Sequence, residues 1–226
     1  MGQDVISPPG HSTFDSPLGL LKFIDQLREL SGGKPVGFKL CIGRQEEFLG
    51  ICKAMLETGL YPDFITVDGG EGGTGAAPIE MTNSVGTPLR DGLIFVHNAL
   101  IGSGVRDKVK IVASGKIFSA FHAARAMALG ADTVNSARGM MLALGCIQAR
   151  SCNTDECPTG IATTNPNRAK GLVVGNKAER VANYHRETVE NLAELVAAAG
   201  LENFAELQPR HINRRVQGTD VKTYAQ

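Results

Sequence analysis

Three cysteines within one short stretch are the residues best suited to chemistry in this chain. Cys146, Cys152 and Cys157 are spaced C-x5-C-x4-C, and Pro158 follows the last of them. Crowded thiolates usually share a metal or an iron–sulfur cluster, because soft sulfur ligands select zinc or iron–sulfur centres. Three ligands with no histidine inside the run fit a structural zinc site poorly, since that site takes four. Three thiolates suit a cluster with three irons, and free buried thiols or a disulfide are the alternatives.

Composition restricts the class of protein. The chain has 226 residues, 42% of them hydrophobic, which is enough for one core or slightly more. The formal net charge is zero and no long basic or acidic block occurs, which argues against a nucleic-acid or membrane partner. No apolar run approaches a membrane span, and the first residues do not resemble a signal peptide. An odd cysteine count without a secretion signal predicts a cytoplasmic protein.

Alternating strands and helices should position the cysteines. Apolar periodicity predicts helices over residues 17–30, 44–58, 88–102, 117–129, 140–145 and 177–199, and strands over 35–42, 63–67, 108–113 and 132–135. This alternation implies right-handed parallel units, either a doubly wound sheet or part of a (β/α)8 barrel. A full barrel has eight strands and about 250 residues, so we expect only half of a barrel.

The same pattern divides the chain into four segments. We expect an extended lead-in over residues 1–17, the βα units over 18–145, a cysteine-rich loop over 146–170, and a C-terminal helix with a surface tail over 171–226.

Ligands of such folds bind at the carboxyl ends of the strands, where Lys39 is the first informative residue. Lys39 is a lone cation in an apolar strand. Burying an unpaired ammonium is costly, so we expect it to face an anion or an electron-rich cofactor edge. A structural lysine paired with a carboxylate is the alternative.

A glycine-rich loop follows the second strand. Residues 68–75 contain five glycines in eight positions but match neither the Walker nor the Rossmann spacing. Such a loop lets backbone approach a flat ring or a substrate carboxylate, whereas the alternative is a merely flexible loop.

Two further strand ends carry small or cationic residues. Ser114 and Gly115 end the third predicted strand, and Arg138 and Gly139 follow the fourth. These positions commonly bind phosphate through free N–H groups and the helix dipole, and Arg138 could add a charge-assisted contact. Ordinary capping turns are the alternative.

The remaining reactive side chains show no catalytic pattern. Cys41 and Cys52 lie in apolar segments and are predicted core residues. His97, His122 and His185 lie on predicted helices without ligand spacing, so we expect solvated or hydrogen-bonded histidines. No Ser-His-Asp set, Cys-His pair or carboxylate dyad is evident.

With these residues placed, the chain resembles the FMN-binding synthase domain of glutamate synthase, and especially the shorter glutamate-synthase-like proteins. The matching motifs are Ile6-Ser-Pro-Pro, Gly37-Phe-Lys-Leu, residues 68–78, Ser114-Gly115, residues 145–152 and residues 157–162. The resemblance implies a (β/α)8 barrel that holds FMN beside a [3Fe-4S] cluster. In that family, reduced flavin reduces the imine formed from 2-oxoglutarate and ammonia, giving glutamate. Electrons come through the cluster from a reductase subunit or ferredoxin.

The resemblance also assigns roles to residues. Lys39 would be catalytic and would lie against both the flavin and the substrate. The cluster ligands would be Cys146, Cys152 and Cys157. The flavin would be lined by Asp68, Gly69, Gly70, Gly72 and Gly73, the substrate would contact Glu71 and Thr74, and the FMN phosphate would lie near Ser114, Gly115, Arg138 and Gly139.

The chain departs from the family pattern in three ways. It begins just before the helix that precedes the fifth strand of such a barrel, so we expect it to need a second copy or a chain with the first half. It contains no glutaminase domain, which makes ammonia itself the expected substrate. Ser114-Gly115 stands where the larger enzymes carry Asp-Gly-Gly. The alternatives are an iron–sulfur electron-transfer or assembly module without flavin catalysis, or a related FMN synthase that uses another amine such as methylamine.

Overall fold

A four-stranded parallel sheet forms the centre of the protein. The computed structural model describes residues 10–71 and 81–226. Strands β1 (Gly37–Leu40), β2 (Phe64–Asp68), β3 (Lys110–Ser114) and β4 (Thr133–Asn135) pair in the order β1-β2-β3-β4. The four predicted strands are therefore confirmed, and each pairs with the next one in the chain. The described residues form an open sheet and do not close it into a barrel.

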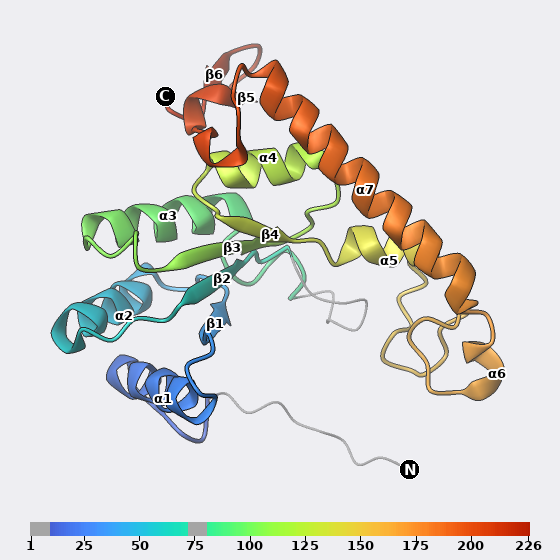
Figure 1. Cartoon of the computed structure of the whole chain (residues 1–226), viewed down its shortest axis with the longest axis horizontal. Coiled ribbons are helices and arrows are strands. Elements are labelled where there is room, and N and C mark those ends of the chain that lie inside the picture. The colour runs from blue at the N-terminus through green and yellow to red at the C-terminus, as the bar shows by residue number, and fades with distance from the viewer. Residues whose placement is uncertain (1–9, 72–80) are drawn as a thin grey trace.

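Helices connect the strands and extend beyond them. Figure 1 shows α1, α2, α3 and α4 following one another along the sheet, with the long α7 crossing beside α4 and α5. The bounds are α1 (Pro17–Leu30), α2 (Gln45–Thr58), α3 (Leu89–Gly102), α4 (Ala120–Ala128), α5 (Arg138–Leu144), α6 (Pro166–Ala169) and α7 (Val174–Ala198). Among the described helices, none has the length and apolar character that a membrane crossing requires.

Local capping explains where several helices begin. The Ser16 hydroxyl accepts a hydrogen bond from Gly19 N at 3.2 Å, and Pro17 is the first helical residue, so the predicted start of α1 is confirmed. Ser119 caps α4 in the same way, which makes α4 begin at Ala120 rather than at the predicted residue 117. The predicted start of α4 was therefore too early, whereas those of α5 and α7 were too late, since these helices begin at Arg138 and Val174.

The core lies around the two central strands. Ile65 and Val67 of β2 and Ile111 of β3 are fully buried, and Phe48 and Leu93 cover them from α2 and α3. Burial of one such side chain contributes about 1.5–3 kcal/mol. Because β1 and β4 are the edge strands, their side chains are more exposed than those of β2 and β3.

The C-terminal tail is more ordered than its sequence predicts. After the short 3-10 helices η1 (Phe204–Glu206) and η2 (Pro209–His211), strands β5 (Asn213–Arg215) and β6 (Val221–Thr223) form an antiparallel hairpin. Leu207 and Ile212 are buried in the core. Apart from Ile212, the tail from Gln208 lies at the surface as predicted, but strands β5 and β6 were not predicted.

Candidate functional site

Lys39 and Asp68 meet at the carboxyl edge of the sheet. Strand register aligns Lys39 of β1 with Thr66 of β2, and the Lys39 Nζ atom lies 3.0 Å from Asp68 Oδ2. The Lys39 side chain is 62% exposed, and that of Asp68 is 23% exposed. Lys39 is exposed because β1 is an edge strand, and the anion that it faces is the Asp68 carboxylate. The alternative, a lysine paired with a carboxylate, is the arrangement observed.

The first part of the glycine-rich loop is held tightly by backbone. Gly69 N donates to Ser114 O at 2.8 Å, and Gly70 N donates to Thr87 O at 2.9 Å. A Cβ atom at Gly70 would collide with the carbonyl group of Gly86. Glycine is required here because two backbone segments pass close together, so a merely flexible loop does not describe residues 69 and 70. Gly72, Gly73 and Thr74 lie outside the described residues.

Glu71 has a structural partner. Its carboxylate accepts hydrogen bonds from Leu89 N at 2.9 and 3.1 Å, at the start of α3. A carboxylate at this position satisfies an otherwise free N–H group and interacts favourably with the positive end of the helix dipole. Glu71 therefore acts as a cap for α3 in this structure.

The ends of β3 and β4 lie beside the same edge. Ser114 pairs with Asp68 on one side and with Asn135 on the other. Gly115 follows in a left-handed conformation, with φ of 149°. Arg138 and Gly139 begin α5, and Gly139 is buried. The structure thus places these predicted residues at consecutive strand ends.

Lys116 follows Ser114 and Gly115 and is an additional cation at this edge. It has a positive φ of 50°, and its Nζ atom donates to Asn83 Oδ1 at 2.9 Å. A non-glycine residue with positive φ is uncommon. The Ser-Gly-Lys order in the sequence offered only a weak signal, since it does not reveal where the ammonium lies.

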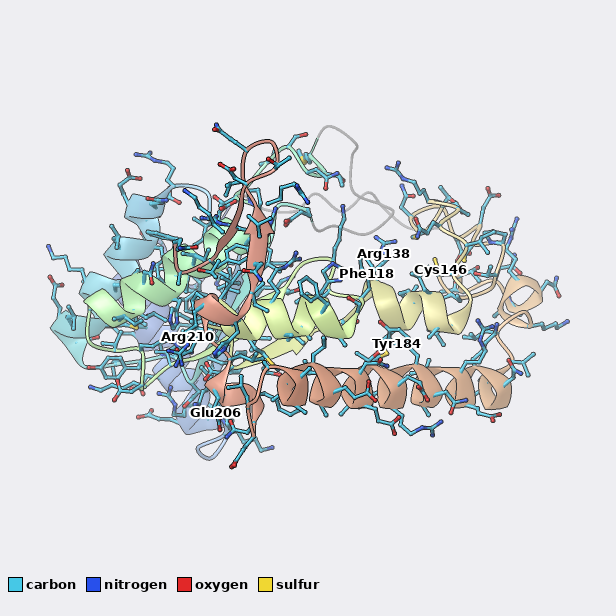
Figure 2. The ribbon with its side chains drawn as sticks, turned by 90° about the horizontal axis from the view of Figure 1, so that it is seen from above. Phe118, Arg138, Cys146, Tyr184, Glu206 and Arg210 are labelled. Atoms are coloured by element: carbon cyan, nitrogen blue, oxygen red, sulfur yellow. The ribbon has the colours of Figure 1, made fainter. Side chains whose placement is uncertain are left out.

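Tyr184 was not predicted as a site residue, although it contacts the segments that follow β3 and β4. Its hydroxyl donates to Phe118 O at 3.0 Å, and a Cβ atom at Gly139 would collide with that hydroxyl. Figure 2 shows Tyr184 on the long helix, facing the region of Phe118 and Arg138. Its helical spacing alone gives no indication of this contact.

The other cysteines and histidines fall outside the predicted chemistry. Cys52 is buried as expected, but Cys41 is exposed, because it follows the end of an edge strand. Partial burial raises the pKa of the Cys41 thiol, and the negative charge of Asp68 adds to this shift. His97 and His122 are hydrogen-bonded to Arg106 and Ser119, as predicted.

The three clustered cysteines occupy the loop between α5 and α6. Cys157 is buried, Cys146 is half-buried and Cys152 is exposed. In the part of the chain that the structure describes, no three His, Cys, Asp or Glu side chains are arranged to hold a metal ion. The thiols are the right donors for an iron–sulfur centre, but they do not converge here.

Cys157 differs from the other two in its surroundings. Its sulfur lies 3.3 Å from Thr159 Oγ1. This hydrogen bond and one from the Ala162 N–H lower the pKa of Cys157 to about 7. A thiol with such a pKa is partly thiolate at neutral pH, which is the form that binds metals.

Comparison with known proteins agrees with the family resemblance seen in the sequence. A family described as "Conserved region in glutamate synthase" matches residues 1–202. The chain is 44% identical over 211 residues to the glutamate synthase large subunit-like protein YerD of Bacillus subtilis, covering 93% of this chain and 40% of that protein. It is 33% identical over 222 residues to the archaeal glutamate synthase [NADPH] of Methanocaldococcus jannaschii, covering 98% of this chain and 43% of that protein.

Two further matches cover a smaller share of this chain, and one of them has a lower sequence identity. The chain is 34% identical over 162 residues to ferredoxin-dependent glutamate synthase 1 of Arabidopsis thaliana, covering 72% of this chain and 10% of that protein. A mutant flavocytochrome b2 with benzoylformate superimposes with a TM-score of 0.47 and 16% identity, covering 82% of this chain and 37% of that one, which is too loose to support a functional argument. The chain spans less than half the length of these relatives. The family match over residues 1–202 and the identity to YerD show that the chain belongs to the glutamate synthase family.

Proposed function

We propose that this chain forms part of a glutamate-synthase-type oxidoreductase, which reduces the imine of 2-oxoglutarate and ammonia to glutamate. The observation that carries the proposal is the Lys39–Asp68 pair at the carboxyl edge of the sheet, in a member of this family. Catalytic groups of α/β barrels lie at that edge. Because the chain spans 40% of YerD, the activity is proposed for the protein in which the rest of the barrel is present.

Lys39 is the residue we assign to the substrate. Its side chain is 62% exposed, so the ammonium can bind a carboxylate of 2-oxoglutarate, while Asp68 holds the Nζ atom 3.0 Å away. A lysine fixed by one carboxylate remains able to contact a second anion, since its ammonium has three donors. Lys39 thereby orients the substrate and balances its charge.

FMN is the cofactor proposed for the same edge. When bound at this edge in its reduced form, FMN would supply the hydride for the imine carbon, with a proton going to the imine nitrogen. Lys116 follows the end of β3 and Arg138 follows the end of β4, and two cations at adjacent strand ends support a phosphate there. We assign Asp68, Gly69 and Gly70 to the flavin, with Gly72 and Gly73, which lie outside the described residues, and we assign Ser114, Gly115, Lys116, Arg138 and Gly139 to the phosphate.

Cys146, Cys152 and Cys157 are the proposed ligands of a [3Fe-4S] cluster. Their thiols have the right chemistry, although the described geometry does not bring them together. A reductase subunit or ferredoxin is the proposed electron donor. The open edges of the sheet at β1 and β4 agree with completion of the barrel by a second copy or another chain.

The test begins with protein purified without oxygen. FMN, iron and acid-labile sulfide are measured on one sample, and glutamate formation is assayed with 2-oxoglutarate, ammonia and a chemical reductant. Lys39→Met is compared with Lys110→Met, because Lys110 also pairs with an aspartate but lies at the opposite end of β3. We expect Lys39→Met to lower kcat/KM about a hundredfold, which is the effect of removing one preorganised donor, and Lys110→Met to leave it unchanged.

The alternatives predict different results. Iron and sulfide without flavin would support an electron-transfer or assembly module. Turnover with methylamine but not ammonia would change the substrate while keeping the enzyme class. A protein that binds neither flavin nor iron when the rest of the barrel is supplied would overturn the proposal.

A further inference from the structure

The two halves of the cysteine loop are built differently. In the second half, Asp155 accepts several hydrogen bonds from the returning chain. Its Oδ1 atom lies 2.6 Å from Thr164 N, 3.1 Å from Thr164 Oγ1 and 3.0 Å from Thr163 Oγ1, and its carbonyl oxygen accepts from Thr163 Oγ1 at 2.7 Å. These contacts close the segment 155–164 into a ring.

Cys157 lies within this ring. Thr159 and the backbone N–H groups of Ile161 and Ala162 face its sulfur. Arg168 closes the ring from the other side, since its guanidinium donates to Glu156 O at 3.1 Å. Cys157 is 9% exposed, so its thiol is already oriented and shielded without a bound group.

In the first half, one hydrogen bond to a cysteine sulfur is found among the described contacts, from Gln148 N to Cys146 Sγ at 3.4 Å. Gln148 and Arg150 have positive φ angles of 57° and 58°. Such angles are unfavourable for long side chains, whereas Asp155, with φ of 62°, belongs to a residue type that tolerates them. Ile147 is 66% exposed, and Cys152 is exposed as well. A strained, exposed segment is a place where a conformational change costs little.

We propose that Cys157 is a preformed cluster ligand held in place by Asp155, and that the segment 146–152 rearranges to bring Cys146 and Cys152 to it. This inference rests on the proposed iron–sulfur centre. Asp155 is a positioning residue, because it acts on Cys157 through residues 161–164 rather than on the cluster. Binding of the cluster then has to rearrange only the segment 146–152. Less conformational entropy is lost than if the whole cysteine loop had to be ordered.

The first test uses iron-free protein and measures alkylation of each cysteine by iodoacetamide, with mass spectrometry to separate the sites. We expect Cys157 to react more slowly than Cys152 in the wild type. Asp155→Ala should speed the reaction of Cys157 about tenfold, because the ring opens. Asp155→Asn keeps an acceptor and a residue that tolerates positive φ, so it should restore protection.

Glu156→Ala is the matched control, because Glu156 is the adjacent carboxylate and makes only an exposed 3.8 Å ion pair with Arg168. It should leave the rate at Cys157 unchanged. Thr163→Val provides a milder opening of the ring if Asp155→Ala disturbs the wider fold, and it should raise the rate by a smaller factor. Equal protection of Cys157 in the wild type, Asp155→Ala and Thr163→Val would overturn the role of Asp155.

The second test adds ferrous iron and sulfide without oxygen. We expect wild-type protein to bind iron. The amide hydrogen-exchange rates of residues 146–152 should then fall strongly, whereas those of residues 159–164 should change little. Loss of exchange spread evenly over both halves would overturn the preformed ligand. Absence of iron in the wild type would overturn the cluster itself, while the alkylation rates still decide whether Asp155 positions Cys157.

Discussion

The two ends of the parallel sheet use charge in opposite ways. At the amino end, Asp63 precedes β2 and Asp132 precedes β4, and each carboxylate is enclosed by donors. Asp63 Oδ2 accepts from Val36 N at 2.7 Å, and Asp132 Oδ2 accepts from Ile111 N at 2.8 Å. In return, Asp63 N and Asp132 N donate to the carbonyl oxygens of the same two residues.

An arginine completes each of these networks. Arg28 lies 3.0 Å from Asp63, and Arg106 lies 2.8 Å from Asp132. Burial alone raises the pKa of Asp63, but the hydrogen bonds from the Val36 N–H and Arg28 outweigh it and hold the pKa below its usual value. The same arrangement thus occurs twice and joins adjacent βα units.

Among the described residues, the carboxyl end carries the Lys39–Asp68 ion pair, in which the lysine is largely exposed. At the amino end, Asp63 and Asp132 are held by backbone N–H groups and an arginine. At the carboxyl end, Glu71 is likewise held by the Leu89 N–H group, but the largely exposed Lys39 retains capacity for another partner. The contrast assigns stability to one end and ligand binding to the other, as in α/β barrels generally.

The largest effect should come from breaking an amino-end network. Asp132→Ala removes the acceptor of Ile111 N and leaves the partly buried Arg106 without its carboxylate, so we expect a loss of about 2–3 kcal/mol in the free energy of unfolding. Asp68→Ala removes a single exposed pair and should cost less than about 1 kcal/mol. Urea unfolding of the two variants measures both values, and equal losses would remove the contrast between the ends.

A second prediction concerns how tightly the loops at the carboxyl end pack against each other. Gly70→Ala forces a Cβ atom against the Gly86 carbonyl group, which is backbone and cannot turn aside. We expect a loss of about 1–3 kcal/mol from this overpacking. Gly43→Ala is the control at the same end, because nothing lies within 4 Å of its Cβ position. If both variants unfold at the same urea concentration, the close approach of the two loops is not a constraint.

How far the sequence predicts this molecule depends on the range of the interactions. Helical and strand periodicity are local, so the four strands and most helices were predicted with small errors at their ends. The sequence also placed Lys39, Asp68 and Ser114 together, because carboxyl ends of parallel strands share one edge.

The remainder depends on contacts between distant residues. Edge and central strands have similar sequences, so the exposure of Lys39 and of Cys41 was not predicted. The partners of Glu71 and of Tyr184 lie on other elements, and helical periodicity cannot identify them. Cysteine spacing predicted the type of donor, but it could not show that one thiol is enclosed and another is exposed.

A smaller effect should follow from Tyr184→Phe. This variant removes the hydrogen bond to Phe118 O but keeps the ring, so we expect a loss of about 1 kcal/mol. FMN affinity should fall as well, because Tyr184 fixes the loops that end β3 and β4. Tyr61→Phe is the control, since the Tyr61 hydroxyl contacts only the exposed Lys108 ammonium at 3.2 Å among the contacts described. Weaker FMN binding in both variants would argue against a specific role for Tyr184.

The smallest effect concerns pH at the amino end. His97 Nδ1 accepts from Arg106 Nε at 3.1 Å, so the ring is neutral in the folded state. Burial lowers the pKa of His97, the positive charge of Arg106 lowers it further, and Asp132 partly opposes them. A histidine with a lowered pKa in the folded state binds its proton first in the unfolded state, so stability falls as the pH drops through about 6.5.

His97→Gln keeps a hydrogen-bond acceptor for Arg106 but does not titrate. Its free energy of unfolding should therefore depend less on pH between about 7.5 and 5.5 than that of the wild type. Some dependence should remain, because burial and Arg125 also lower the pKa of His122. Urea unfolding at several pH values measures the difference, and parallel curves for the two proteins would show that His97 does not contribute. A measured difference would add a proton-sensitive element to the amino-end network of Arg106 and Asp132.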